Sequence, residues 1–130
     1  TVLGIIHSAR GDHHTAIEAY HHGLGIENSL QNEAGQVMLH NRLGDTFRAM
    51  GDYGQASNHY SSSLQLAQKL NDQMGIALTS ERLGDLANEW NDRHAAQQHW
   101  QAALLIRHNL GHYDEQKSLR ERLRQLGDYI

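Results

Sequence analysis

The chain has 130 residues, of which 38% are hydrophobic and 20% are charged, as in a folded protein with its own core rather than in a disordered chain. It contains no cysteine, which excludes disulfides, thiolate catalysis and cysteine-ligated zinc and is compatible with a cytoplasmic location. The net charge is −4, with no long basic or apolar run, so we expect neither direct nucleic-acid binding nor a membrane span.

The sequence repeats itself with a period of 40 residues. Residues 3–42 and 43–82 are identical at 11 aligned positions, and residues 43–82 and 83–122 at 10. Such self-similarity is typical of repeat architectures, in which each unit is one supersecondary element. We therefore predict a single repeat domain over residues 1–130, as a fragment of a longer protein. Its units are expected at about 3–42, 43–82 and 83–122, with a partial unit at 123–130.

Taken in chain order, the elements are helices separated by two-residue turns. The given sequence is expected to begin within a first helix that ends at Gly11-Asp12. Apolar residues at helical spacing predict further helices over 33–50 and 53–70. Glycine or asparagine at a turn supplies a left-handed residue, and the following aspartate accepts backbone N–H bonds from the next helix. Proline is absent, so nothing interrupts these helices. The remaining turns are expected at Gly51-Asp52, Asn71-Asp72, Asn91-Asp92 and Gly111-His112.

Glycine recurs inside the predicted helices at the same position of each 40-residue unit. This is unexpected, because glycine inside a helix lowers its stability by roughly 1 kcal/mol relative to alanine. The physical interpretation is that a partner helix crosses closely and leaves no room for a Cβ. Small residues would face the crossing, and large aromatic residues would fill the space beside it. The glycines are Gly4, Gly44 and Gly84, the small residues Ala16, Ala56 and Ala96, and the aromatics Tyr20, Tyr60 and Trp100.

The order of these residues resembles the tetratricopeptide repeat. The period is longer than the usual 34 residues, and the closing proline of that repeat is missing. The longer period is similar to a subgroup found in LGN/Pins-type polarity adaptors and in bacterial regulators that carry a signal-transduction ATPase module. In the middle unit the resemblance rests on Leu43, Gly44, Phe47, Gly51, Tyr53, Ala56, Tyr60 and Leu64.

This resemblance implies an all-α fold, an α-solenoid of about seven helices whose antiparallel hairpins stack in a right-handed superhelix. The first helix of each hairpin would line a groove that binds a protein or peptide, so we expect a signalling scaffold without cofactor or enzymatic activity. The groove positions are rich in carboxylates and amides, which favours a partner with basic or backbone-polar groups. They are Met38, Asn41, Asp45 and Arg48, then Leu78, Glu81, Asp85 and Asn88, and finally Ser118, Glu121 and Gln125.

The chain contains 11 histidines, so a metal site has to be weighed. The best constellation is His14, Glu18 and His22, which share one helix face at spacings of four. This spacing matches no known metal motif, and we predict no metal site. A subtler use of the histidines would be partner binding that depends on pH near neutrality.

An alternative function is self-association through the ends of the array. An uncapped solenoid end exposes apolar surface that can stack on another repeat or on a second copy. The residues that would do so are Val2, Leu3, Ile5 and Ile6.

Overall fold

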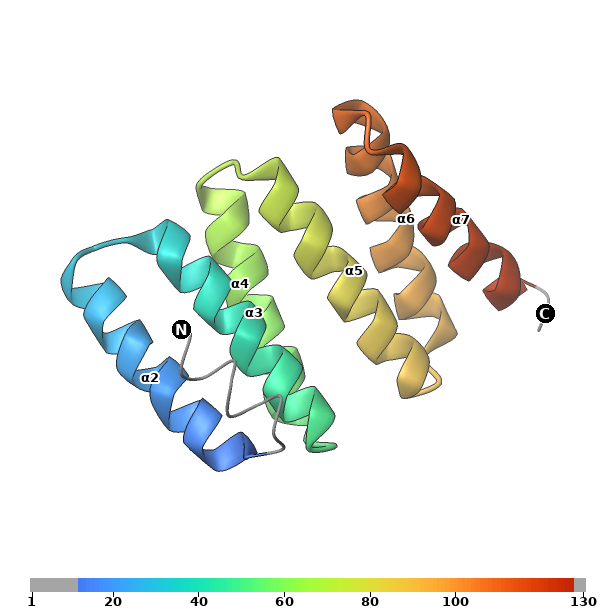
Figure 1. Ribbon diagram of the computed structural model, residues 1–130. Coiled ribbons are helices and arrows are strands. Elements are labelled where there is room, and N and C mark those ends of the chain that lie inside the picture. The colour runs from blue at the N-terminus through green and yellow to red at the C-terminus, as the bar shows by residue number, and fades with distance from the viewer. Residues whose placement is uncertain (1–11, 128–130) are drawn as a thin grey trace. The chain divides into compact units, whose positions relative to one another are not determined.

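The computed structural model describes residues 12–127, and within them it is all-α (Figure 1). The six helices of this part agree with the expectation of about seven, and the helix predicted before Gly11 lies outside the described residues, as do Val2 to Ile6 and residues 128–130. The helices are α2 (His13–Ser29), α3 (Glu33–Ala49), α4 (Tyr53–Lys69), α5 (Gln73–Glu89), α6 (Arg93–Leu110) and α7 (Tyr113–Gly127).

The helix starts follow one rule. The residue before each of α2 to α6 accepts a hydrogen bond from the backbone N–H three residues later, which satisfies one of the donors that a helix start leaves open. The donor–acceptor distances are 3.0–3.2 Å. These N-cap residues are Asp12, Asn32, Asp52, Asp72 and Asp92.

The helix ends confirm the turns predicted at Gly51, Asn71, Asn91 and Gly111 and add one, whereas Gly11 lies outside the described residues. Gly51 and Gly111 have φ of 80° and 73°, and Asn71 and Asn91 have φ of 52° and 60°. Gln31, with φ 54°, occupies the same position between α2 and α3. The sequence pattern did not indicate Gln31, because a left-handed glutamine lacks the short side chain that makes asparagine tolerant of this conformation.

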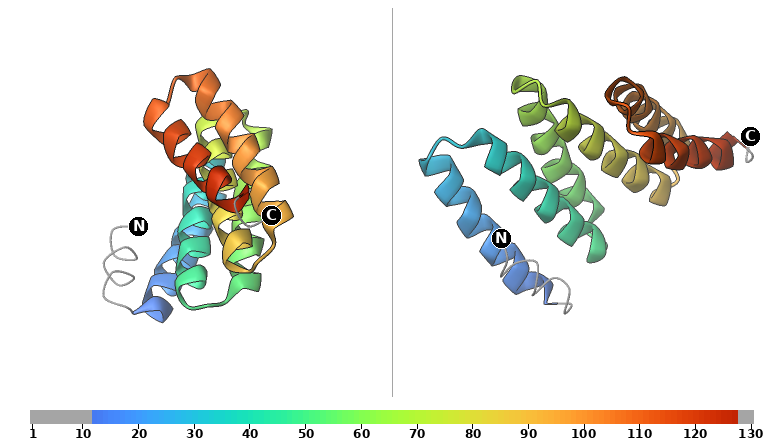
Figure 2. Two further views of the ribbon diagram at one scale, coloured as in Figure 1. Left: turned by 90° about the vertical axis from the view of Figure 1, so that its right-hand side faces the viewer. Right: turned by 45° about the horizontal axis from the view of Figure 1, so that its top comes forward.

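The chain forms two compact units, residues 1–71 and 72–130, which we call unit 1 and unit 2. In unit 1, α3 packs against both α2 and α4, and in unit 2, α6 packs against both α5 and α7. Consecutive helices within a unit run antiparallel (Figures 1 and 2). The hairpins are therefore α3/α4 in unit 1 and α5/α6 in unit 2. We call α3, α5 and α7 first helices, and α2, α4 and α6 second helices.

Each unit has its own small core. In unit 1 the buried residues Ala16 and Tyr20 of α2 meet Leu39 and Leu43 of α3, with Phe47 packed beside them. The core of unit 2 joins α6 to α7, through Ala96, Trp100, Ala103, Leu119 and Leu126. The phased alanines and aromatics are thus core residues, as their periodicity predicted.

The interior glycines lie directly under the aromatic rings of the second helices. A Cβ built on Gly44 would overlap the Tyr60 ring, and one built on Gly84 would overlap the indole of Trp100. Both rings are almost fully buried, so moving either one aside would disturb the packing around it. The prediction that a Cβ does not fit at these glycines is confirmed, but the notch over each glycine is filled by the aromatic side chain and not by the alanine expected to face it. In α7 the same phase is occupied by Arg124, so the described part of that helix carries no notch.

Replacing Gly44 with alanine tests this notch. Alanine has the higher helix propensity, but its Cβ would force Tyr60 out of a fully buried site, so we expect Gly44→Ala to lose about 1–3 kcal/mol of unfolding free energy. Gly25→Ala is the matched control, because no atom lies within 4 Å of the added Cβ, and it should gain up to about 1 kcal/mol. Urea denaturation measures both, and equal stabilisation by the two substitutions would contradict the notch.

Candidate partner-binding surface

The residues predicted to contact a partner share one face of each first helix. On α3, Met38, Asn41, Asp45 and Arg48 are spaced by three and four, so they follow one stripe. Met38 is 58% exposed, Asp45 and Arg48 are half-buried, and Asn41 is only 6% exposed. The stripe therefore runs along the boundary between the core and solvent, with its accessible part at Met38, Asp45 and Arg48.

Asp45 is held in place from the neighbouring helix. The hydroxyl of Tyr60, on α4, donates a short hydrogen bond to Asp45 Oδ1. Since Tyr60 is also the residue over Gly44, one side chain fills the notch with its ring and orients a carboxylate with its hydroxyl. A buried tyrosine normally finds such a partner for its hydroxyl, and here the partner is a half-buried carboxylate.

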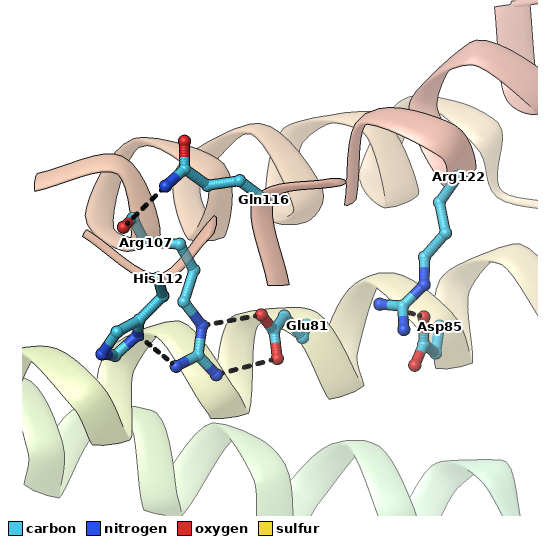
Figure 3. Close-up of polar contacts among 6 residues, drawn as sticks. All are labelled: Glu81, Asp85, Arg107, His112, Gln116 and Arg122. Atoms are coloured by element: carbon cyan, nitrogen blue, oxygen red, sulfur yellow. Dashed lines mark hydrogen bonds and ion pairs between the residues drawn. The ribbon is translucent and has the colours of Figure 1, made fainter. Parts of the chain in front are cut away.

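Unit 2 repeats this arrangement with a different donor. Trp100 Nε1 donates to Asp85 Oδ1 at 3.1 Å, and Trp100 is the residue over Gly84. Arg122 of α7 also reaches this carboxylate, with its Nη1 3.4 Å from Oδ1 (Figure 3). Asp85 thus ties α5 to both α6 and α7. The carboxylate of the first helix is linked to the aromatic residue of the second helix in both hairpins.

A second carboxylate of α5, Glu81, is engaged inside unit 2. Arg107 of α6 donates to both of its oxygens, from Nε at 2.9 Å and from Nη2 at 3.2 Å (Figure 3). The side chains of Arg107 and Glu81 are only 6% and 13% exposed. Arg107 Nη1 also lies 2.9 Å from His112 Nδ1, and since arginine can only donate, this imidazole nitrogen is the acceptor.

The same ion pair is absent from the corresponding positions of unit 1. Asn41 and Ala67 stand where unit 2 has Glu81 and Arg107, and both are buried. The buried pair is therefore an addition to the repeat rather than part of it. Sequence reasoning missed Arg107, and the available signal was an arginine at a phase where the preceding unit has alanine.

The other predicted contact residues lie as follows. Leu78 is half-buried and Asn88 is exposed on α5. On α7, Ser118, Glu121 and Gln125 are exposed, and Arg124 donates to Glu121 on the same helix. That hydrogen bond is the main cause that lowers the pKa of Glu121, so its perturbation reflects a solvated ion pair within one helix.

The three residues considered as metal ligands in the sequence do not come together in a metal centre. His14, Glu18 and His22 are exposed, and residues 12–127 hold no group of three or more histidine, cysteine or acidic side chains arranged to bind an ion. The histidines that do come together are His21, His40 and His59, one from each helix of unit 1. Sequence spacing could not indicate them, because they are 19 residues apart and on three helices.

The comparison with known families agrees with the repeat. A family model described as tetratricopeptide repeat matches residues 36–109, which span most of both hairpins. The chain belongs to the tetratricopeptide repeat family. Its fold generally serves as a scaffold for protein–protein interaction and is typically not enzymatic.

Among solved structures, this tetratricopeptide repeat chain is similar to the crystal structure of BtubC (BKLC) from P. vanneervenii. The TM-score is 0.76, with 19% sequence identity over 98% of this chain and 61% of that chain. The likeness shows a shared fold, and the chain spans about 61% of the length of that protein. No curated protein matches the chain at a significant level.

The described helices of this repeat chain are 15 to 18 residues long. None of those within residues 12–127 is both long enough and apolar enough to cross a bilayer.

Breaking the buried ion pair of unit 2 should be strongly destabilising. In Glu81→Gln the guanidinium of Arg107 stays buried without a counter-charge, and we expect a loss of about 3–5 kcal/mol in unfolding free energy. The double variant E81N/R107A copies Asn41 and Ala67 of unit 1 and removes both charges, so it should recover most of that loss. Urea denaturation of E81N, R107A and the double variant gives the coupling energy, and additive effects would contradict the pair.

Proposed function

We propose that this chain is a protein- or peptide-binding module whose contact surface is the exposed face of its first helices. In unit 1 this face belongs to α3, and in unit 2 it belongs to α5 and α7. The observation that carries the proposal is the carboxylate on each hairpin's first helix, Asp45 and Asp85, which an aromatic donor of the second helix holds in a fixed orientation. Pre-oriented polar groups bind with a smaller entropic loss than mobile ones.

The chemistry of these faces favours a partner with basic or backbone-polar groups. A carboxylate accepts several hydrogen bonds, so a lysine, an arginine or a peptide N–H of a partner could bind the same oxygens that the internal donors orient. Exposed apolar and amide side chains, Met38 and Asn88, stand one or two turns from these carboxylates and could supply packing and further hydrogen bonds. Glu81, whose two oxygens accept hydrogen bonds from Arg107, would stabilise the packing of α5 on α6 beneath this face.

The setting we propose is the sensor or adaptor part of a larger regulatory protein that works in the cytoplasm. The 40-residue period supports two such settings, a polarity adaptor of the LGN/Pins type and a bacterial regulator with a signal-transduction ATPase module. In both, the repeat would hold a partner segment while another domain acts. Self-association remains the alternative function, and the experiment below distinguishes it.

Binding of peptide libraries to surface variants tests this function. We expect a lysine- and arginine-rich library to bind the chain more tightly than a glutamate-rich one, because carboxylates line the first-helix faces. Met38→Ala and Asn88→Ala should each weaken binding by about tenfold or less, the range of single interface contacts. The affinities can be measured by isothermal calorimetry, and binding should weaken with added salt.

The matched controls lie on second helices. Leu105 on α6 is as exposed as Met38, at 63%, and Asn58 on α4 is exposed like Asn88. Leu105→Ala and Asn58→Ala should leave the affinity unchanged. Equal losses from the second-helix variants, or preferred binding of the acidic library, would contradict the proposed surface. Light scattering of the chain alone, showing a concentration-dependent dimer, would favour self-association instead.

A further inference from the structure

The three helices of unit 1 each contribute one histidine to a single cluster. His21 comes from α2, His40 from α3 and His59 from α4, and His59 lies in the middle. Its ring centroid is 5.3 Å from that of His40 and 5.9 Å from that of His21, which it meets edge to face. His59 also stacks in parallel on Phe47, with ring centroids 5.5 Å apart. We call His21, His40 and His59 the histidine cluster.

The closest contact in the cluster requires at least one of its two imidazoles to be neutral. His40 Nδ1 and His59 Nδ1 lie 3.1 Å apart, so one nitrogen carries the hydrogen and the other accepts it. The accepting ring is neutral and protonated only on Nε2. A proton added to its Nδ1 would replace this hydrogen bond with two opposed N–H groups and place a positive charge between His40 and His59, which are half-buried, whereas His21 is exposed.

The surroundings of the cluster also disfavour charge. Burial is the main cause that lowers the pKa of His59 to about 4, and the neighbouring His40 and His21 add to the effect. Burial, with His21, also lowers the pKa of His40. The titratable groups that face His59 are thus His21 from α2 and His40 from α3, and the other ring against it, Phe47 of α3, carries no charge. On α2, the carboxylate of Glu18 lies one turn before His21 and is exposed.

We propose that the histidine cluster makes unit 1 an acid-sensitive element, in which proton uptake loosens the packing of α4 against α3. The inference concerns unit 1 by itself and holds whether or not the first helices bind a partner. If they do, acidification would release a partner from α3 by loosening the helix that carries the contact residues. The geometry thereby gives the histidines a role that the spacing of His14 and His22 did not indicate.

The direction of the pH effect follows from the lowered pKa values. A histidine whose pKa is lower in the folded state than the ordinary 6.5 takes up protons more readily when unfolded. Its contribution to stability is therefore complete above about pH 6.5 and is lost as the pH falls toward about 4. The stability of unit 1 should decline across this window.

Unit 2 provides a control within the same molecule. His99 occupies the position of His59 one repeat later, and burial lowers its pKa as well. However, Ser80 stands where unit 1 has His40, and Ala87 where it has Phe47. Unit 2 thus has the half-buried histidine of the second helix without a partner histidine on the first helix. A pH effect caused by burial alone would appear in both units, whereas one caused by the cluster would be larger in unit 1.

Hydrogen exchange of the full chain, followed by mass spectrometry at about pH 7.5 and about pH 5, tests the proposal after correction for intrinsic exchange rates. We expect amides of α2 to α4 to lose about tenfold in protection on acidification and those of α5 to α7 to lose less. His40→Ser, which copies unit 2, should remove most of the extra loss in unit 1. His99→Gln is the control substitution and should leave that loss unchanged.

Equal losses in the two units, or the same acid sensitivity in His40→Ser as in the original chain, would overturn the proposal. A measurement without substitutions guards against a variant that fails to fold. Nitrogen-15 spectra of the imidazoles report protonation and tautomer directly. We expect His59 to titrate near pH 4, and a midpoint near the ordinary 6.5 would overturn the proposal as well.

Discussion

The structure depends on one contact that occurs in each hairpin, an aromatic ring of the second helix lying over a glycine of the first. Tyr60 over Gly44 and Trp100 over Gly84 bring the two helices close enough to bury the rings, and no side chain larger than hydrogen fits beneath them. The hydroxyl of Tyr60 and the indole N–H of Trp100 also donate hydrogen bonds, which orient the half-buried carboxylates of Asp45 and Asp85. Packing and the orientation of a potential binding group are therefore coupled in a single residue of each hairpin.

Around this shared contact the two units have diverged in their polar interiors. Unit 2 joins its helices with a buried ion pair between Glu81 and Arg107, to which His112 contributes an acceptor. Unit 1 has asparagine and alanine at the positions of that pair and instead gathers three histidines where its helices meet. Buried polar groups need hydrogen-bond partners, and the two units provide these partners with different residues.

Repeat proteins tolerate this divergence because each unit is stabilised mainly by its own contacts and those with its neighbours. The phased positions must satisfy the same geometry in every unit and are held constant. The unphased positions on the first helices are free to vary, which makes them the natural place for recognition of a partner. Asn88 and Met38 are of this kind, whereas Glu81, although unphased, serves the interior.

The sequence by itself determined the helices, their turns, the notch glycines and the family, because these follow from spacing along the chain and recur at a fixed period. It also indicated which face of the first helices carries carboxylates. Only the tertiary structure decided which of those groups are engaged: Asn41 is buried, Glu81 is paired with Arg107, and His21, His40 and His59 meet across three helices. Contacts between helices depend on how each helix is rotated about its own axis when it packs against its neighbour. The spacing of residues along the chain does not encode this rotation for positions that do not recur in the repeat.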